Sequence, residues 1–443
     1  MTDDVNRKKL RDWFFYNRRH LLLIEKQIEV LRTELQENQQ RMTTLAEAAK
    51  RNRQGLKEYV SLEIANLPSD NGILIMGFYG ARNIGDELML KTLLDYFDKK
   101  GVRATVMMSD NYSFDTSYYA PHKVIHYPRR PDDIAYIVEK FDTFVWGGGA
   151  TIDDQNYYYN GENTSLAYSA MAISKSAIKN HKKVMVLGVS ANRTITDHKF
   201  INDLNYVIQG AKFFSLRDEN SLKTLKEARV DSEKITIIDD LALSQLDFYN
   251  NEKKNNDKLT IGLVYILNDK TINKLSEYTK KLILYLEKNI KEDVEILMIP
   301  FYDYLNNDYE MYKKILKEIE NTEINQRILV RIIETIDESV SSLLKCDLAF
   351  GMRYHAILLA SCAGVKTVAI DYSTEHRHYY NKVAYVKKNY NPEILTFKFG
   401  EPTEEFEKII ERAFSVKRLD VQEKKEQSKK FAGKMNDLLK NLF

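Results

Sequence analysis

Cysteine is scarce in this sequence. The 443 residues contain only two cysteines, Cys346 and Cys362, and both stand among apolar neighbours. Two such cysteines provide neither a disulfide framework nor the paired spacing of a zinc site, and they fit a reducing cytoplasm. Because 44% of the residues are hydrophobic, we expect the protein to be stabilised by ordinary hydrophobic cores.

The sequence also lacks long apolar runs and an excess of charge of either sign. Leu21–Ile24 is far too short for a signal peptide or a membrane span, so we expect a cytoplasmic protein. The 66 basic residues nearly balance 64 acidic ones, and a net charge of +2 gives no support for nucleic-acid binding. Tyrosine is abundant, at 28 residues against 2 tryptophans, which suits a hydroxyl-rich ligand.

Residues 1–66 differ from the rest of the chain because they carry a heptad repeat. This a/d pattern predicts a helical coiled coil, in which Asn38 and Asn52 would fix the register. We therefore expect a homo-oligomer that forms through residues 14–56. The alternative is a long amphipathic helix that folds back on its own globular part. The a/d positions are Leu21, Ile28, Leu35, Met42, Ala49 and Leu56, with Ile24, Leu31 and Leu45 at the companion position.

A short segment before the heptads mixes aromatic and basic residues. Trp13–Arg19 has the composition of an interfacial membrane anchor. A cap on the coiled coil would explain the same residues. Peripheral association with the inner face of the membrane is thus one of two interpretations of this segment.

From residue 67 onward, short apolar runs alternate with helical patterns, which predicts βαβ units and parallel sheets. The polar stretch Asn250–Asp257 divides these runs into two sets. We predict an α/β fold of two Rossmann-like domains, residues 67–250 and 258–443, with a cleft between them. Beyond Thr403 we expect amphipathic helices, the last of which crosses back to the first domain. The expected strands are 73–76, 102–107, 144–146, 184–187, 213–215 and 235–238, then 259–265, 294–299, 328–332, 348–350 and 367–370.

A glycine-rich loop, Gly77–Gly85, joins the first expected strand to the first helix. Its glycines, Gly80 among them, let the backbone approach a ligand, and the helix that follows offers free N–H groups to an anion. We expect Asp86 to be the N-cap of that helix. The spacing matches neither the dinucleotide pattern nor a P-loop, and tight packing explains the loop equally well.

A second glycine segment follows the strand that ends at Trp146. Gly147, Gly148 and Gly149 are consecutive, which is poor for stability and indicates a backbone that approaches something closely. Asp153 and Asp154 follow. Their carboxylates could bind sugar hydroxyls or accept a proton, and capping of the next helix is an equally good explanation.

Charged side chains follow two further strands. Arg217 offers a planar fork for a carboxylate or phosphate, and Ser221 begins the next helix; an ion pair at a helix start is the alternative. In the second domain, Arg353 and His355 place a cation and a titratable imidazole where open α/β sheets bind ligands. A lone histidine beside an apolar helix is more often structural, so the case depends on the other loops.

Taken together, these segments resemble the polysaccharide pyruvyl transferase family over roughly residues 72–375. The resemblance implies a glycosyltransferase-B-like (GT-B-like) fold of two Rossmann-like domains. It also implies transfer of the enolpyruvyl unit of phosphoenolpyruvate to sugar hydroxyls of a polysaccharide, as a pyruvate ketal. The residues that carry it, in chain order, are Gly77–Glu87, Gly147–Gly149 with Asp154, Arg217–Ser221 and Met352–Ala356.

The same resemblance implies roles for these residues. Arg217 and Arg353, with Ser221 beside them, would hold the carboxylate and phosphate of the donor, and His355 would protonate its methylene carbon. Phosphoenolpyruvate is a substrate, so neither a cofactor nor a metal ion is expected. The acceptor, a sugar or lipid-linked glycan, would face Gly80, Asn83, Asp86, Gly147, Gly148, Gly149 and Asp154.

One turn departs from the family. After the strand that ends at Ile370 the family usually shows a Tyr-Asp-Pro-Lys-like turn, whereas this chain has Asp371–His378. Arg377 or Lys382 could replace the missing lysine. Two other functions fit the same motifs: a nucleotide-sugar-dependent glycosyltransferase of this architecture, and a non-catalytic scaffold of glycan synthesis that acts through its coiled coil.

Overall fold

A computed structural model describes most of the chain beyond residue 53. Two compact units are distinguished, Met1–Leu62 and Glu63–Phe443, and the second contains both predicted domains. The heptad positions, Trp13–Arg19 and the polar stretch 250–257 lie outside the described residues, so the predictions made for them stay predictions. The described residues are 54–55, 57–67, 72–108, 119–128, 130–155, 157, 166–191, 194–249, 258–302, 307–320, 325–372, 382–415 and 421–443.

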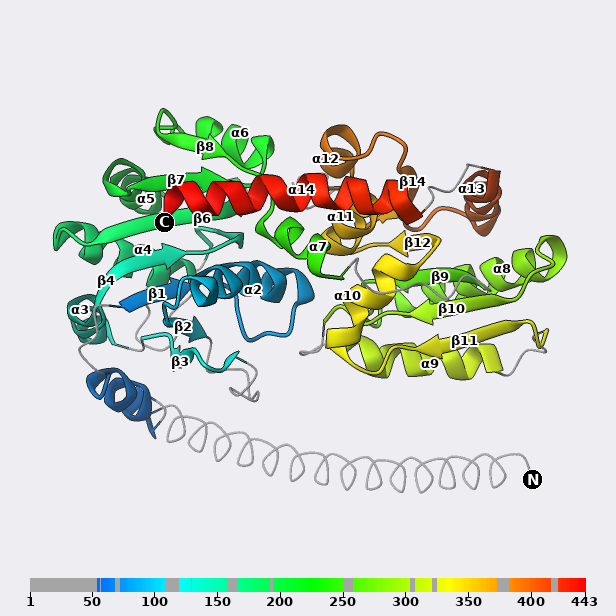
Figure 1. Ribbon diagram of the computed structural model, residues 1–443, viewed down its shortest axis with the longest axis horizontal. Coiled ribbons are helices and arrows are strands. Elements are labelled where there is room, and N and C mark those ends of the chain that lie inside the picture. The colour runs from blue at the N-terminus through cyan, green and yellow to red at the C-terminus, as the bar shows by residue number, and fades with distance from the viewer. Residues whose placement is uncertain are drawn as a thin grey trace, which may run out of the picture. The chain divides into compact units, whose positions relative to one another are not determined.

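The first part of this second unit contains a parallel sheet with the strand order β3-β2-β1-β4-β6-β7-β8, and β5 pairs with β6 (Figure 1). The central strands are buried on both faces, as parallel strands covered by helices must be. The strands are β1 (Gly72–Met76), β2 (Ala104–Met108), β3 (Lys123–His126), β4 (Phe141–Trp146), β5 (Gly149–Ile152), β6 (Lys183–Ala191), β7 (Phe213–Leu216) and β8 (Ile235–Ile237). The helices are α2 (Ile84–Lys99), α3 (Pro131–Lys140), α4 (Leu166–Lys179), α5 (His198–Gly210), α6 (Glu219–Glu227), the 3₁₀ helix η2 (Leu241–Gln245) and α7 (Leu246–Tyr249).

The second sheet is also parallel and has the order β11-β10-β9-β12-β13-β14. In chain order within the domain this is 3-2-1-4-5-6, the arrangement of a Rossmann fold, and the first sheet starts with the same 3-2-1-4 pattern. The strands are β9 (Leu259–Val264), β10 (Val294–Met298), β11 (Ile328–Ile332), β12 (Leu348–Gly351), β13 (Lys366–Asp371) and β14 (Leu395–Lys398). The helices are α8 (Ile272–Asn289), α9 (Asp308–Glu320), α10 (Ile336–Lys345), α11 (Tyr354–Cys362), α12 (Lys382–Asn389), α13 (Thr403–Ser415) and α14 (Val421–Leu442).

The two Rossmann-like sheets confirm the expected fold class, and each expected strand corresponds to an observed one. The sequence did not indicate β3, β5 and β14. These strands have four residues each, and their burial is partial or interrupted, so the periodicity on which the expectation relied is weak.

The start of α2 differs from the expectation. The N-cap is Asn83, and Asp86 lies in the first helical turn, so the prediction that Asp86 caps this helix is wrong. The helix begins earlier because the backbone of Asn83 forms an antiparallel bridge with Tyr302, and the N–H of Ile84 donates to the carbonyl of Phe301. A contact with the second domain therefore fixes where the first helix begins.

Helix α14 crosses back to the first domain, as expected, and packs on η2, α7 and α11 (Figure 1). Met435 and Leu439 are buried in an apolar core that also contains side chains of α2 and α11. The Phe443 ring packs on Phe97, with centroids 4.9 Å apart. This core thus joins residues from both domains. Among the described helices, none is long and apolar enough to cross a membrane.

Candidate active site

The site lies where the carboxyl ends of central strands from both sheets meet. The loops after β1 and β4 stand at the point where the strand order of the first sheet reverses, and the turn after β12 stands at the same point of the second. Open α/β sheets bind ligands at such points. His355 lies in the first turn of α11, directly after the turn that follows β12, and contacts the first domain.

His355 packs directly on Gly85 in the first turn of α2. A Cβ atom added to residue 85 would lie 1.6 Å from Nδ1 of His355, so no side chain fits there. His355 is 8% exposed, and its ring lies edge-on to Tyr354, with centroids 5.0 Å apart. Gly85 is therefore required because the imidazole of the other domain occupies the space of its side chain.

Arg217 and Asp240 meet the other nitrogen of the imidazole. Nη1 of Arg217 donates to Oδ2 of Asp240 over 3.0 Å. Nε2 of His355 lies 3.3 Å from that Nη1 and 3.4 Å from the same Oδ2. A protonated Nε2 donates to Asp240, and a neutral Nε2 accepts from Arg217. The imidazole therefore has a partner at Nε2 in both protonation states.

Asp86 completes this group, and we call Asp86, Arg217, Asp240 and His355 the junction cluster. The Asp86 carboxylate approaches the backbone of Gly149, since a Cβ added there would lie 3.0 Å from Oδ1. Gly149 also has a φ of +121°, which favours glycine. Asp86 is 7% exposed.

Burial and neighbouring charges act in opposite directions on the carboxyl groups of the cluster. Burial raises the pKa of Asp86 to about 6, although His355 and Arg217 counteract it. Burial would also raise the pKa of Asp240, but His355, Arg217 and the N–H of Ala242 outweigh it and hold this pKa below its usual range. At neutral pH Asp240 is thus a firm anion, while Asp86 is close to the range in which it exchanges a proton.

At other glycines of the two loops, neighbouring side chains occupy the space that a Cβ atom would need. A Cβ at Gly147 would lie 2.0 Å from the hydroxyl of Tyr79, and one at Gly148 would lie 2.4 Å from the sulfur of Met89. Gly80 has a φ of +84° and donates its N–H to Glu87. The close approach predicted for the glycine segment is therefore made, at Gly147 and Gly148, to the packed side chains of α2 and its loop.

Two predicted site residues have side-chain oxygens that bind the protein backbone, and a third, Asn83, contributes its backbone carbonyl to α2. Oδ2 of Asp154 accepts the N–H groups of Thr196 and Asp197 over 2.7 and 2.9 Å. Oγ of Ser221 accepts the N–H of Ala191 and is buried. The carbonyl of Asn83 accepts the N–H of Glu87. Asp154 thus contacts the residues just before α5, whose N-cap is Asp197, and not the start of α4, the next helix in the chain.

Arg353 is the N-cap residue of α11, and its ion-pair partner differs from that of Arg217. Nη2 donates to the fully buried Asp308 over 2.7 Å, and the guanidinium carbon lies 5.3 Å from the centroid of the Tyr302 ring. Nε is buried, and the Nε–H of this arginine is thus left without a hydrogen bond among the described residues.

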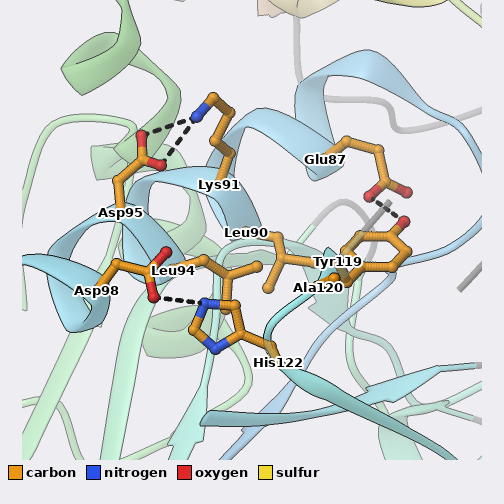
Figure 2. A pocket seen from close by; sticks show the side chains of 9 residues that line it. All are labelled: Glu87, Leu90, Lys91, Leu94, Asp95, Asp98, Tyr119, Ala120 and His122. Atoms are coloured by element: carbon orange, nitrogen blue, oxygen red, sulfur yellow. Dashed lines mark hydrogen bonds and ion pairs between the residues drawn. The ribbon is translucent and has the colours of Figure 1, made fainter. Parts of the chain in front are cut away.

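A cavity of about 240 Å³ lies beside α2 and is lined by nine residues (Figure 2). Its polar groups pair with one another: Lys91 with Asp95, His122 with Asp98, and Glu87 with Tyr119. Burial raises the pKa of Glu87 to about 7, against the hydrogen bonds from Tyr119 and Gly80. The adjacent residues Asp86 and Glu87 therefore point to different sites: Asp86 belongs to the junction cluster, and Glu87 lines this cavity.

Asp240 is a site residue that the sequence patterns did not single out. It directly follows the expected strand 235–238, and the rule that selected Arg217 and His355 could have selected it. Among the described residues, no group of three His, Cys, Asp or Glu side chains is placed to hold a metal ion.

Two parallel-sheet domains whose strand ends meet at one site define a GT-B-like protein. A putative UDP-N-acetylglucosamine 2-epimerase from Listeria monocytogenes shares this fold at 15% identity, with 82% of this chain and 92% of that chain covered and a TM-score of 0.52. The Neisseria meningitidis UDP-GlcNAc 2-epimerase bound to UDP-GlcNAc gives 10% identity, 83% and 98% coverage and a TM-score of 0.51.

The family model of polysaccharide pyruvyl transferase matches residues 83–374, and the chain belongs to this family. The matched region contains the whole junction cluster. Among curated proteins, none matches the chain.

Proposed function

We propose that this protein transfers the enolpyruvyl group of phosphoenolpyruvate to a sugar of a cell-surface polysaccharide or its precursor, as a pyruvate ketal. The observation that carries the proposal is the contact of His355 with Arg217 and Asp240 in a chain of this family. Phosphoenolpyruvate is small and densely negative, so it needs fixed cations rather than a nucleotide-shaped groove.

His355 is the proposed general acid. It protonates the methylene carbon of the donor, and C2 becomes electrophilic as the double bond is lost. Its two partners at Nε2 suit a group that releases and regains a proton. Arg217 and the remaining donor of Arg353 would bind the anionic groups of the substrate.

Asp86 is the proposed base for the acceptor. Its raised pKa makes its carboxylate a better proton acceptor than an ordinary aspartate. A sugar hydroxyl attacks C2 and gives its proton to Asp86. Phosphate then leaves C2, and a neighbouring hydroxyl attacks C2 and gives its proton to the departing phosphate, which closes the ketal. The net products are the pyruvylated sugar and inorganic phosphate.

The test compares wild type with His355→Gln by thermal unfolding and by turnover. Phosphoenolpyruvate must raise the melting temperature of the wild type, because a ligand that binds the native state stabilises it by mass action. We expect His355→Gln to keep its fold and lose transfer by at least about a hundred-fold, the usual contribution of a general acid. Full activity in this variant would rule out the mechanism.

A nucleotide-sugar-dependent glycosyltransferase is the second candidate, because structures of the same fold include one bound to UDP-GlcNAc. It predicts stabilisation by a nucleotide sugar and none by phosphoenolpyruvate. A shift with both ligands would fit a pyruvyl transferase that uses the nucleotide sugar as acceptor, and turnover assays separate these outcomes.

For the acceptor we propose a chemical class and no particular sugar. We propose a sugar or lipid-linked glycan precursor that the protein meets in the cytoplasm or at the inner face of the membrane. Self-association through residues 14–56 would present several copies of the site to one glycan.

A further inference from the structure

Lys382 gives the junction cluster a second cation. It is the first residue of α12, and its Nζ lies 5.8 Å from the centroid of the Tyr354 ring. The guanidinium carbon of Arg217 lies 4.8 Å from the same centroid. Tyr354 directly precedes His355 and contacts it. An ammonium and a guanidinium thus share one aromatic ring beside the imidazole.

The positive charge of Lys382 has no ion-paired carboxylate of the kind that Arg217 has among the described residues. Arg217 forms an ion pair with Asp240, whereas no ion pair joins Lys382 to a carboxylate in the part of the chain that the structure describes. Burial and the nearby Arg217 lower the pKa of Lys382 to about 8, against the carboxylates of Asp86, Asp218 and Asp240. Holding this cation beside another costs free energy that a bound anion would recover.

Two of the three carboxylates near Lys382 are already engaged. Asp240 accepts from Arg217 and from the N–H of Ala242, and Asp218 accepts the N–H of Ser221 at the start of α6. Neither can turn to Lys382 without leaving a buried donor unpaired. An external anion would satisfy Lys382 without such a loss.

Arg353 provides the contrast. Its charge is balanced within the second domain by Asp308, which is fully buried. Lys382, by comparison, contacts the same Tyr354 ring as Arg217 and forms no ion pair among the described residues. Arg217 and Lys382 are the two cations that meet at the Tyr354 ring, and this shared position is the reason to consider them together as an anion site.

We propose that Lys382 and Arg217 form the subsite for the phosphate group of the donor, with Lys382 in the role of the lysine missing from the turn after β13. The identity of the donor rests on the proposed function, whereas the anion site does not. Departing phosphate would leave its negative charge between the same two cations. Lys382 thus assists departure as well as binding.

This assignment implies a pH dependence of binding. Only the ammonium form of Lys382 attracts the anion, so the contribution of Lys382 to affinity should fall as the pH rises through about 8. The groups that face Lys382 are Arg217, Asp86, Asp218, Asp240 and Tyr354. Arginine stays charged throughout this range, as do the ionised carboxylates. The pH dependence therefore distinguishes Lys382 from a residue that only supports the fold.

The test is calorimetric titration of the full-length protein with phosphoenolpyruvate, and separately with inorganic phosphate, at pH 7 and pH 9. We expect Lys382→Met to weaken both ligands by about ten-fold or more at pH 7, because a hydrogen bond to a charged group is lost. Lys382→Arg should retain the affinity and abolish its fall at pH 9. The matched control is Lys388→Met on the same helix, where the side chain is 75% exposed, and it should bind like wild type.

The possible outcomes separate this proposal from the proposed function. Wild-type affinity for both ligands in Lys382→Met, or an unchanged fall at pH 9 in Lys382→Arg, overturns the role of Lys382. Binding of inorganic phosphate that depends on Lys382, without binding of phosphoenolpyruvate, supports the anion site and refutes the donor. Loss of binding in Lys388→Met as well would also count against a specific site.

Discussion

Asp86 is a buried carboxyl group whose ionisation costs the fold free energy. Its pKa in the folded protein is about 6, above the ordinary value of 3.8, and burial is the main cause. An unfolded chain ionises this group at lower pH than the folded chain does. Stability is therefore lost as the pH rises from about 4 to about 6, and the loss persists at neutral pH.

Removing this charge should reveal its cost. We predict that Asp86→Asn loses transfer activity but unfolds at a higher free energy than wild type at pH 7, by up to roughly 3 kcal/mol, since each pKa unit corresponds to about 1.4 kcal/mol. The gain should vanish near pH 4, where the wild-type carboxyl is protonated. Denaturant titrations across this pH range provide the measurement.

Glu87→Gln is the matched comparison for that experiment. The Glu87 pKa of about 7 predicts a similar loss of stability between about pH 4.5 and 7, but this carboxylate lies outside the junction cluster. The Glu87→Gln variant should therefore alter the pH dependence of stability with a smaller effect on transfer. Identical pH profiles for Asp86→Asn and wild type would contradict the assignment.

Gly85 tests how closely the two domains must approach. A methyl group there would overlap Nδ1 of His355, so we predict that Gly85→Ala displaces the imidazole and lowers the turnover rate at least ten-fold. Gly433 in α14 has open space around its Cα, and Gly433→Ala should leave activity unchanged while stabilising the helix by up to about 1 kcal/mol. Normal turnover in Gly85→Ala would show that His355 can act from another position.

At the scale of elements, the long buried strands were predictable because their apolar runs are continuous. The first and last residues of the helices were less predictable. The start of α2 at Asn83 depends on a bridge to Tyr302, a residue of the second domain, and no local pattern encodes it. Strand β5 lies inside a glycine segment that resembles a loop.

Helix α14 is the element whose packing is most easily tested. Leu439 is 1% exposed in the core that contains side chains of both domains, so Leu439→Ala should lower the free energy of unfolding by about 2–4 kcal/mol. Lys440→Ala, at the next position, removes a side chain that is 67% exposed and should change stability by less than about 0.5 kcal/mol. Denaturant unfolding measures both, and equal effects would refute the packing.

At the scale of the whole molecule, the site arises only when the domains meet. The sequence identified Arg217 and His355 because each follows a strand, but their 3.3 Å contact joins residues from separate domains. Tertiary packing also determines the ion pair between Arg353 and Asp308 and the position of Lys382. Spacing along the chain therefore indicated which residues are at the site, and not which of them pair.

The shared core also predicts how the molecule unfolds. Since one apolar core contains side chains of β1, α11 and α14, we expect the two sheets to lose structure together. Native-state hydrogen exchange should give β1 and β12 the same highest free energy of opening. A clearly lower value for one of these strands would indicate domains that unfold independently.

The crossing of α14 has a consequence for synthesis. The first domain emerges from the ribosome early, and domains usually fold in that order. Its core, however, is completed by Met435 and Leu439 of α14, which packs on η2 and α7, and by the ring of Phe443, which packs on Phe97. The apolar surface of η2 and α7 that α14 covers therefore stays exposed until residues 421–443 have been made, and during that interval the nascent chain is exposed to aggregation and is a natural client for chaperones.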